Sequence, residues 1–341
     1  SHCPVVAVDV PSGLSARTGQ IMGVAMRAAL TPTFIGLKQG LFTAEAADRV
    51  GEVVFDDLQV PAAVHDGMQP PARRLRPTAL AEALSQRPRT AHKGAFGHVL
   101  VIGGDHGMGG AVRIAAEAAA RSGAGLTSVA TRPAHVAALI AGRPELMVQA
   151  VTEPDELAAP LARADVVALG PGLGQAGWGR ALFEAVRDAD RPLVVDADGL
   201  NWLARAPGRR DDWILTPHPG EAARLLETDL ATIDRDRFAA VSAIARRYGG
   251  VAVLKGAGSL IGDGERCLVC DEGNPGMASG GMGDALTGVI AALRAQGLDA
   301  WAAASIGVQV HARAADRAAR GGERGLLATD VLDALRGVIN P

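Results

Sequence analysis

Aromatic residues, lysine and cysteine are all scarce in this sequence. Aromatic side chains make up 3% of the 341 residues, with a single tyrosine, and three lysines stand against 31 arginines. The three cysteines are Cys3, Cys267 and Cys270. So small and odd a set gives no disulfide framework and is typical of a reducing compartment. We therefore exclude a disulfide-rich secreted protein and expect a cytoplasmic one.

Long apolar runs and an excess of positive charge are missing as well. No run approaches the roughly 20 apolar residues that a membrane span requires. The formal net charge is −3 at pH 7, so the composition offers no strongly basic surface for nucleic acid or acidic lipid. We expect a soluble protein with no nucleic-acid partner and no membrane partner.

Glycine and apolar residues are abundant by contrast, with 43 glycines and 48% hydrophobic residues. From Lys93 onward, apolar stretches lead repeatedly into Gly-bearing loops, with helical stretches between them. These stretches span residues 98–104, 126–131, 166–174, 192–200, 213–226 and 251–259. The alternation predicts a mostly parallel α/β sheet covered on both faces, with ligands at the carboxyl ends of its strands. Three further strand-like pieces precede this region: Val5–Val10, Thr31–Leu37 and Gly51–Leu58.

The strongest motif is NPGMASGGMGDALTG, Asn274–Gly288, which leads into a helical run over Ala285–Gln296. A Gly-rich loop before a helix offers backbone N–H groups and the positive end of the helix dipole to a phosphate. Asp284, at the start of that helix, is poorly suited to bind phosphate but well placed to accept a proton as a general base. The alternative is that Asp284 is simply an N-cap.

Two shorter motifs indicate the same edge of the sheet. The segment Lys255–Ser259 (KGAGS) follows an apolar strand and could reach phosphate oxygens, although it is not a complete P-loop. His218 lies between two prolines in TPHPGE. So rigid a turn suits either a ligand contact or a purely structural histidine.

Other candidates are weaker. Asp196 and Asp198, in DADGLN, could hold a metal ion through water or cap the next helix. Cys267 and Cys270 have CxxC spacing, but no second ligand pair accompanies them. We interpret the two cysteines as residues of an ordinary strand.

In this order, KGAFGHVLVIGG, GPGLG, DADGLN, TPHPGE, LKGAGS and NPGMASGGMGDALTG resemble one domain of the bacterial NAD(P)H-hydrate repair enzymes. That domain is the ADP-dependent (S)-NAD(P)H-hydrate dehydratase. The resemblance covers residues 75–341 and implies a ribokinase-like three-layer α/β sandwich with a mostly parallel central sheet.

Residues 1–60 resemble the carboxyl-terminal part of the NAD(P)H-hydrate epimerase domain, through VDVPSGLSARTG, TFIGLKQGL and GEVVFDDL. This implies a partial Rossmann-like piece, joined to the dehydratase domain by a linker over residues 61–74. The front of the epimerase domain, with its phosphate-binding loop, is not in the sequence, so we expect epimerase activity to be lost. In this piece the resemblance implies that Asp9 touches substrate and that Ser12 holds a potassium ion.

The resemblance also implies roles in the dehydratase domain. The hydrated nicotinamide nucleotide would contact Ala111, Gly172, His218 and Asp284. The adenine nucleotide would lie along Lys255, Gly256, Ala257, Gly258 and Ser259 and at Gly283.

The implied reaction removes water from C6 of the reduced nicotinamide ring. The β-phosphoryl group of ADP would activate the C6 hydroxyl, Asp284 would take its proton, and NAD(P)H, AMP and phosphate would result. On chemical grounds we expect Mg²⁺ to bridge the phosphates, and we also expect a homo-oligomer. Two alternatives stay open: an ATP-dependent vitamin-alcohol kinase of the same fold, and a non-catalytic nucleotide sensor.

Overall fold

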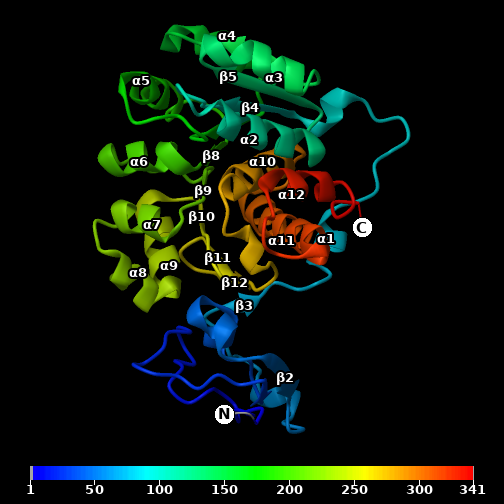
Figure 1. Ribbon diagram of the computed structural model, residues 1–341, viewed down its shortest axis with the longest axis vertical. Coiled ribbons are helices and arrows are strands. Elements are labelled where there is room, and N and C mark those ends of the chain that lie inside the picture. Colours follow the sequence, from blue (N-terminus) through cyan, green and yellow to red (C-terminus); the bar gives the residue numbers. More distant parts are fainter. Residues whose placement is uncertain (1–2, 341) are drawn as a thin grey trace.

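The computed structural model describes residues 3–340, and most of them form a ten-stranded sheet between two layers of helices (Figure 1). The strand order is β3-β12-β11-β10-β9-β8-β7-β4-β5-β6, and β11 alone runs antiparallel to both its neighbours. The strands are β3 (Arg73–Arg74), β4 (His98–Ile102), β5 (Leu126–Thr131), β6 (Met147–Ala150), β7 (Val166–Leu169), β8 (Leu193–Val195), β9 (Ile214–Leu215), β10 (Val251–Leu254), β11 (Ser259–Gly262) and β12 (Cys267–Cys270).

Helices cover both faces of this sheet, as the alternation of apolar strands and helical stretches predicts. One face carries α1 (Ala79–Ala83), α2 (Gly109–Arg121), α3 (Val136–Gly142), α10 (Met282–Ala295), α11 (Ala300–Ala318) and α12 (Ala328–Leu335). The other carries α4 (Ala158–Arg163), α5 (Gly177–Val186), α6 (Ala197–Arg205), α7 (Pro219–Leu225), α8 (Leu230–Arg235) and α9 (Arg237–Tyr248). Along β4, Val99 and Val101 face the first layer while Leu100 and Ile102 face the second. A strand buried on both faces reads as an unbroken apolar run.

Helices α2 and α10 pack closely enough to fix where the Gly-rich loop ends. A Cβ atom at Gly288 would lie 2.0 Å from the carbonyl oxygen of Ala115, so only glycine permits this approach. At the N-cap of α10, a Cβ atom at Gly281 would lie 2.8 Å from Cδ1 of Ile114. The start of α10 therefore lies beside the middle of α2.

Residues 3–60, the N-terminal part, lie at one end of the molecule (Figure 1). They form a two-stranded parallel sheet of β1 (Leu30–Phe34) and β2 (Glu52–Asp56). Their own small core consists of Leu14, Ala25, Leu41, Ala46 and Val50.

The strand expected over Val5–Val10 is wrong. This segment follows β1 through one isolated bridge, between Val6 and Leu30. Ala7 donates its N–H to the Leu30 carbonyl, but the next bond of a parallel ladder would need an N–H at residue 32. That residue is Pro32, which has no N–H. Asp9 N–H still donates to the Pro32 carbonyl (2.8 Å), but without the bond between these two no second bridge forms.

The predicted linker, residues 61–74, ends inside the main sheet. Arg73 and Arg74 form β3, which pairs with Leu268 and Val269 of β12. Among the helices of the described residues, none is long and apolar enough to cross a membrane.

Candidate active site

The predicted site lies where the strands of the main sheet end. Lys255 follows β10, Thr216 follows β9, and Asp196 follows β8. Helices α7 and α2 begin shortly after β9 and β4, so their amino-terminal ends face the same edge. The amino-terminal end of α10 reaches this edge because α10 packs along α2.

Asp196 and Lys255 form the centre of the site. The Lys255 ammonium lies 2.6 Å from Asp196 Oδ1; the Asp196 side chain is buried and that of Lys255 is mostly covered. The hydroxyl of Thr216 also donates to Oδ1 (2.8 Å), and that of Thr287 donates to Oδ2 (2.8 Å). Burial alone would raise the pKa of Asp196, but Lys255 and the two hydroxyls outweigh it and hold the pKa below its usual value. Burial likewise disfavours charge on Lys255, yet Asp196 and Glu221 raise the pKa of the ammonium.

His218 and Glu221 cap helix α7 reciprocally. His218 Nδ1 accepts from the N–H of Gly220 (3.0 Å), and Glu221 Oε2 accepts from the N–H of His218 (2.8 Å). A lone pair on Nδ1 requires that the neutral ring carry its proton on Nε2. Burial, followed by the charge of Lys255, lowers the pKa of His218 and favours this neutral form. The half-exposed imidazole can therefore donate from Nε2, which lies 3.5 Å from Glu221 Oε1.

Glu221 is buried, and its Oε2 lies 3.9 Å from the Lys255 ammonium. Burial and the charge of Asp196 raise the pKa of Glu221 to about 7, against the opposing effect of Lys255. With this pKa, the Glu221 carboxyl is suited to proton transfer near neutral pH. The sequence presents it only as the residue that opens the next helix.

Asp284 lies in the first turn of α10, and its side chain is half-buried. The N-cap position belongs to Gly281, which has φ +89°, so Asp284 is not the N-cap of this helix. Burial is the main cause that raises the pKa of Asp284 to about 7, with the charge of Asp196 next. A carboxylate with that pKa is matched to proton transfer near neutral pH.

The Gly-rich turn before Asp284 lies against the central ion pair. A Cβ atom at Gly283 would lie 3.1 Å from Lys255 Nζ and 3.5 Å from Asp196 Oδ2. The first hydrogen bond of the helix runs from Ala285 N–H to the Gly281 carbonyl (2.9 Å). The earlier amides of the turn have no intrahelical acceptor, which is the arrangement that suits an anion.

Gly172 and Ala111, two predicted contacts of the hydrated nucleotide, are neighbours. A Cβ atom at Gly172 would lie 3.2 Å from Cβ of Ala111 and 2.8 Å from the carbonyl oxygen of Met108. Gly172 also has φ +57°, a left-handed conformation that glycine adopts readily. The loop after β7 therefore rests directly on the start of α2.

Asp198 has a structural partner in the same region. Its Oδ2 accepts from the N–H of Gly174 (2.9 Å), which ties α6 to the loop after β7. Asp196 occupies the N-cap position of α6, as one of the two predicted roles required, but its side chain makes no capping hydrogen bond. In the described residues, no group of three or more His, Cys, Asp or Glu side chains could hold a metal ion.

The remaining predicted residues of the adenine site run from the end of β10 to Ser259, the first residue of β11. Gly256 and Ala257 are exposed, while Gly258 and Ser259 are partly covered. Lys255 N–H donates to the Pro217 carbonyl (2.9 Å), so this 255–259 loop is joined to the His218 turn.

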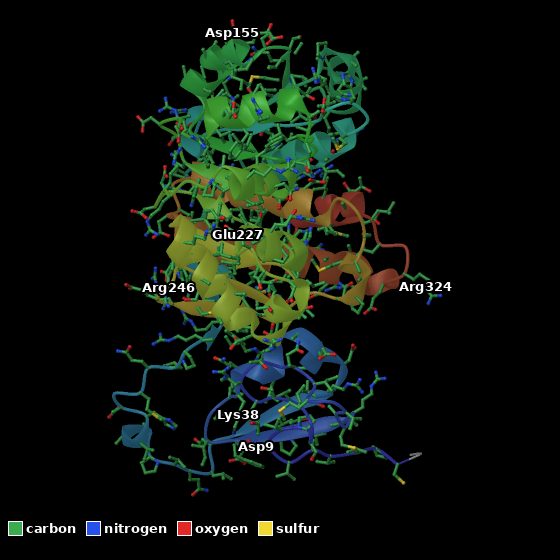
Figure 2. The ribbon with its side chains drawn as sticks, turned by 90° about the vertical axis from the view of Figure 1, so that its left-hand side faces the viewer. Asp9, Lys38, Asp155, Glu227, Arg246 and Arg324 are labelled. Carbon is green, nitrogen blue, oxygen red and sulfur yellow. The ribbon has the colours of Figure 1, made fainter. Side chains whose placement is uncertain are left out.

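Asp9 and Ser12 lie elsewhere, in the N-terminal part, where Asp9 and Lys38 form an ion pair (Figure 2). Thr33 donates to Asp9 Oδ1 (2.9 Å), and these contacts outweigh burial to lower the pKa of Asp9. Ser12 is exposed in a turn. The structure therefore does not bring these two residues to the sheet edge.

Two other features lie apart from this edge. Cys267 and Cys270 belong to β12, where burial raises the pKa of each thiol to about 12, so neither is a ready nucleophile. A cavity of about 630 Å³, lined by His98, Leu126 and Met147 among others, opens at the other end of β4 and β5. It includes none of the predicted site residues.

Comparisons with known proteins identify the family of the chain. The sequence matches the NAD(P)H-hydrate dehydratase family over residues 99–336 and the YjeF-related protein N-terminus over residues 1–40. The bifunctional NAD(P)H-hydrate repair enzyme of Coxiella burnetii is 52% identical over 339 residues, which are 99% of this chain and 70% of that protein. The corresponding enzyme of Escherichia coli is 47% identical over 344 residues, 100% of this chain and 66% of that protein. The chain thus spans about two thirds of the length of these relatives.

A solved structure supports the fold. The ADP/ATP-dependent NAD(P)H-hydrate dehydratase of Bacillus subtilis, crystallised with ATP and Mg²⁺, superposes with a TM-score of 0.69 at 27% identity. The match covers 78% of this chain and 97% of that one. The predicted ribokinase-like α/β fold with a mostly parallel sheet is confirmed. The chain belongs to the NAD(P)H-hydrate repair enzymes, through the NAD(P)H-hydrate dehydratase family that matches most of its length.

Proposed function

We propose that this chain dehydrates the (S) form of NAD(P)H hydrate with ADP as phosphoryl donor, and releases NAD(P)H, AMP and phosphate. One observation carries the proposal. Asp284, whose pKa is raised to about 7, lies in the same helical turn as Gly283, beside the Lys255–Asp196 pair. A base and an anion-binding turn are thereby adjacent, as transfer of a phosphoryl group to a hydroxyl requires.

The chemistry needs a better leaving group than hydroxide. Asp284 removes the proton from the C6 hydroxyl of the hydrate, and the hydroxyl oxygen forms a bond to the β-phosphorus of ADP while AMP departs. The ring nitrogen then supplies the electron pair that expels phosphate and leaves an iminium at C6. Loss of a proton from C5 to solvent restores the C5=C6 double bond of the reduced nicotinamide. The hydroxyl oxygen thus leaves with the phosphate, the hydroxyl proton passes to Asp284, and the C5 proton goes to solvent.

The chain's other residues position the reactants. The amides at the start of α10 face the transferred phosphoryl group, where one well-placed donor contributes about 3 kcal/mol to the transition state. Lys255 and the 255–259 loop bind the adenine nucleotide. Gly172, Ala111 and His218 hold the hydrate, with Nε2 of His218 as a donor.

Mg²⁺ stays a prediction drawn from phosphate chemistry. Both oxygens of Asp196 already accept hydrogen bonds, from Lys255, Thr216 and Thr287. The described side chains thus offer no cage for the ion, and its ligands would come mostly from the nucleotide. The Bacillus subtilis relative was crystallised with ATP and Mg²⁺. We derive no step through the metal.

Loss of epimerase activity and a homo-oligomeric state also stay predictions. The first concerns the N-terminal part, where Asp9 contacts Lys38 and Thr33 and where Ser12 is exposed. Conversion of the R-hydrate tests whether epimerase activity is lost, and addition of K⁺ tests the ion assigned to Ser12. Light scattering of the purified chain tests the homo-oligomeric state.

The deciding experiment follows the near-ultraviolet absorbance of NADH from purified (S)-NADH hydrate with ADP, with ATP, and with neither. ADP-dependent turnover that releases AMP and phosphate in equal amounts is expected. Turnover with ATP but not with ADP would show that ATP is the phosphoryl donor. No turnover with either nucleotide, together with ATP-dependent phosphorylation of a vitamin alcohol, would establish the kinase alternative.

A further inference from the structure

The N-terminal part touches the 255–259 loop on its inner side. Thr43 is fully buried, and its hydroxyl donates to the Gly258 carbonyl (2.8 Å). The next residue, Ala44, donates its N–H to the Ala257 carbonyl (3.1 Å). The contact joins residues more than 200 positions apart in the chain.

Arg237, the first residue of α9, completes this contact. Its Nη1 donates to the Thr43 hydroxyl (2.9 Å) and to the Ala257 carbonyl (2.6 Å), and its Nη2 donates to the carbonyls of Leu254 and Lys255 (3.2 Å each). Arg237 is only 4% exposed, and burial lowers the pKa of its guanidinium to about 10. These hydrogen-bond partners are all uncharged oxygens, from Thr43, the end of β10 and the 255–259 loop, while the charge of Asp234 also favours the charged guanidinium.

Glycine makes the close contact possible. A Cβ atom at Gly258, where φ is +62°, would lie 1.9 Å from the Phe42 carbonyl oxygen. A Cβ atom at Gly256 would lie 2.8 Å from Arg237 Nη2. The loop therefore fits against both the N-terminal part and Arg237.

The direction of the carbonyls has a consequence for the amides. In a trans peptide the C=O and the following N–H point in opposite directions. Because the carbonyls of Lys255 and Ala257 are held inward, the N–H groups of Gly256 and Gly258 are turned toward the outer side of the loop. Two outward amides, one on either side of Ala257, over a buried guanidinium are suited to an anionic ligand.

We propose that Thr43 and Arg237 are positioning residues for the adenine nucleotide, so that the N-terminal part sets the nucleotide affinity of the dehydratase domain. The inference rests on the proposed function, which places the nucleotide on the 255–259 loop. Thr43 never touches the nucleotide; it acts through the loop carbonyls. The N-terminal part thus serves the dehydration reaction independently of any epimerase chemistry.

The test compares Thr43→Val and Thr43→Ser with Thr31→Val in the full chain. Thr31 is the matched control: it is fully buried in the N-terminal part and donates to the Val50 carbonyl (2.6 Å), away from the loop. Calorimetry measures the Kd for ADP, and kinetics measure KM for ADP, KM for the hydrate and kcat. Thr43→Val is expected to raise the Kd and KM for ADP about tenfold, the effect of leaving a buried carbonyl without its donor.

The expected pattern leaves kcat and the KM for the hydrate within about twofold of the unaltered protein, because a shift confined to one KM marks lost binding. Thr43→Ser, which keeps the hydroxyl, should restore the affinity, and Thr31→Val should leave it unchanged. Equal ADP affinity in Thr43→Val and the unaltered protein would overturn this inference and leave the proposed function unaffected. An unaltered protein that binds no adenine nucleotide contradicts the proposed function, and this inference with it.

Hydrogen exchange keeps the test decisive if Thr43→Val unfolds. Coupling between two sites is reciprocal, so ADP should slow exchange of the Ala44 amide, which donates to Ala257. Exchange at that amide that is equal with and without saturating ADP would overturn the inference.

Discussion

The Lys255 ammonium lies 2.6 Å from Oδ1 of Asp196, and the two residues end strands that are separated in the sheet only by β9. Thr216, which follows β9, donates to the same oxygen. Three consecutive strand ends therefore converge on one carboxylate. The arrangement fixes the position of Lys255 beneath the Gly-rich turn.

Asp196→Asn should destabilise the fold. The change leaves the buried Lys255 charge without its carboxylate, which costs about 3 kcal/mol in the free energy of unfolding. Urea denaturation measures the loss. Asp155→Asn, a matched change of an exposed aspartate (Figure 2), should alter the same free energy by less than about 0.5 kcal/mol. Equal stability of the two variants would show that the ion pair contributes little.

Asp284→Asn should abolish turnover while nucleotide binding persists. Loss of a general base typically slows a reaction about 10²- to 10⁴-fold. Initial rates of NADH formation test the first part, and calorimetric titration with AMP tests the second. Near-normal turnover in this variant would remove Asp284 from the mechanism.

The pH profile should have an acidic limb near neutrality. A base must be deprotonated to act, and the pKa of Asp284 is about 7, so kcat/KM should fall about tenfold per pH unit below that value and level off above it. Glu221→Gln removes a negative charge that raises the pKa of Asp284, and should move the limb to lower pH. A profile that stays flat down to the usual aspartate pKa would exclude Asp284 as the base. Circular dichroism over the same range separates unfolding from titration.

Gly172→Ala should weaken hydrate binding. The added Cβ would lie 2.8 Å from the Met108 carbonyl oxygen, and displacement of this loop would move the start of α2. We expect KM for the hydrate to rise about tenfold or more, because misplaced contacts lower the reaction efficiency steeply. Gly297→Ala is the control, since that glycine has φ +99° with open space around it, so it carries the backbone strain without the contact. If both variants raise KM equally, the effect is strain alone.

The sequence predicts most of the main sheet because of how parallel strands are buried. The apolar runs that become β4, β7 and β10 are buried on both faces, so they lack polar interruptions. Strand β6 escapes prediction because it is an edge strand with mixed exposure. Strand β11 begins at Ser259, within a segment that reads as a loop. Helix α10 begins at Met282, before the predicted Ala285, because a glycine precedes its first turn.

The sequence likewise predicts only part of the candidate site. Asp284 is visible in the sequence because a Gly-rich loop before a helix is a local pattern. The network around Asp196 is not, because its partners Thr216, Lys255 and Thr287 come from separate elements that only the strand order brings together. Arg237 and Thr43 escape for the same reason, and no local signal marks either.

Strand β3 determines where the chain can be cut to separate the dehydratase domain from the N-terminal part. Its two residues cover the free side of β12, and Leu75 N–H continues the contact with the Val269 carbonyl (2.8 Å). A fragment that starts after Arg74 would leave β12 as a bare sheet edge, which is a template for pairing with other chains. A dehydratase fragment that begins ahead of Arg73 should stay monodisperse, whereas one trimmed two residues further should aggregate.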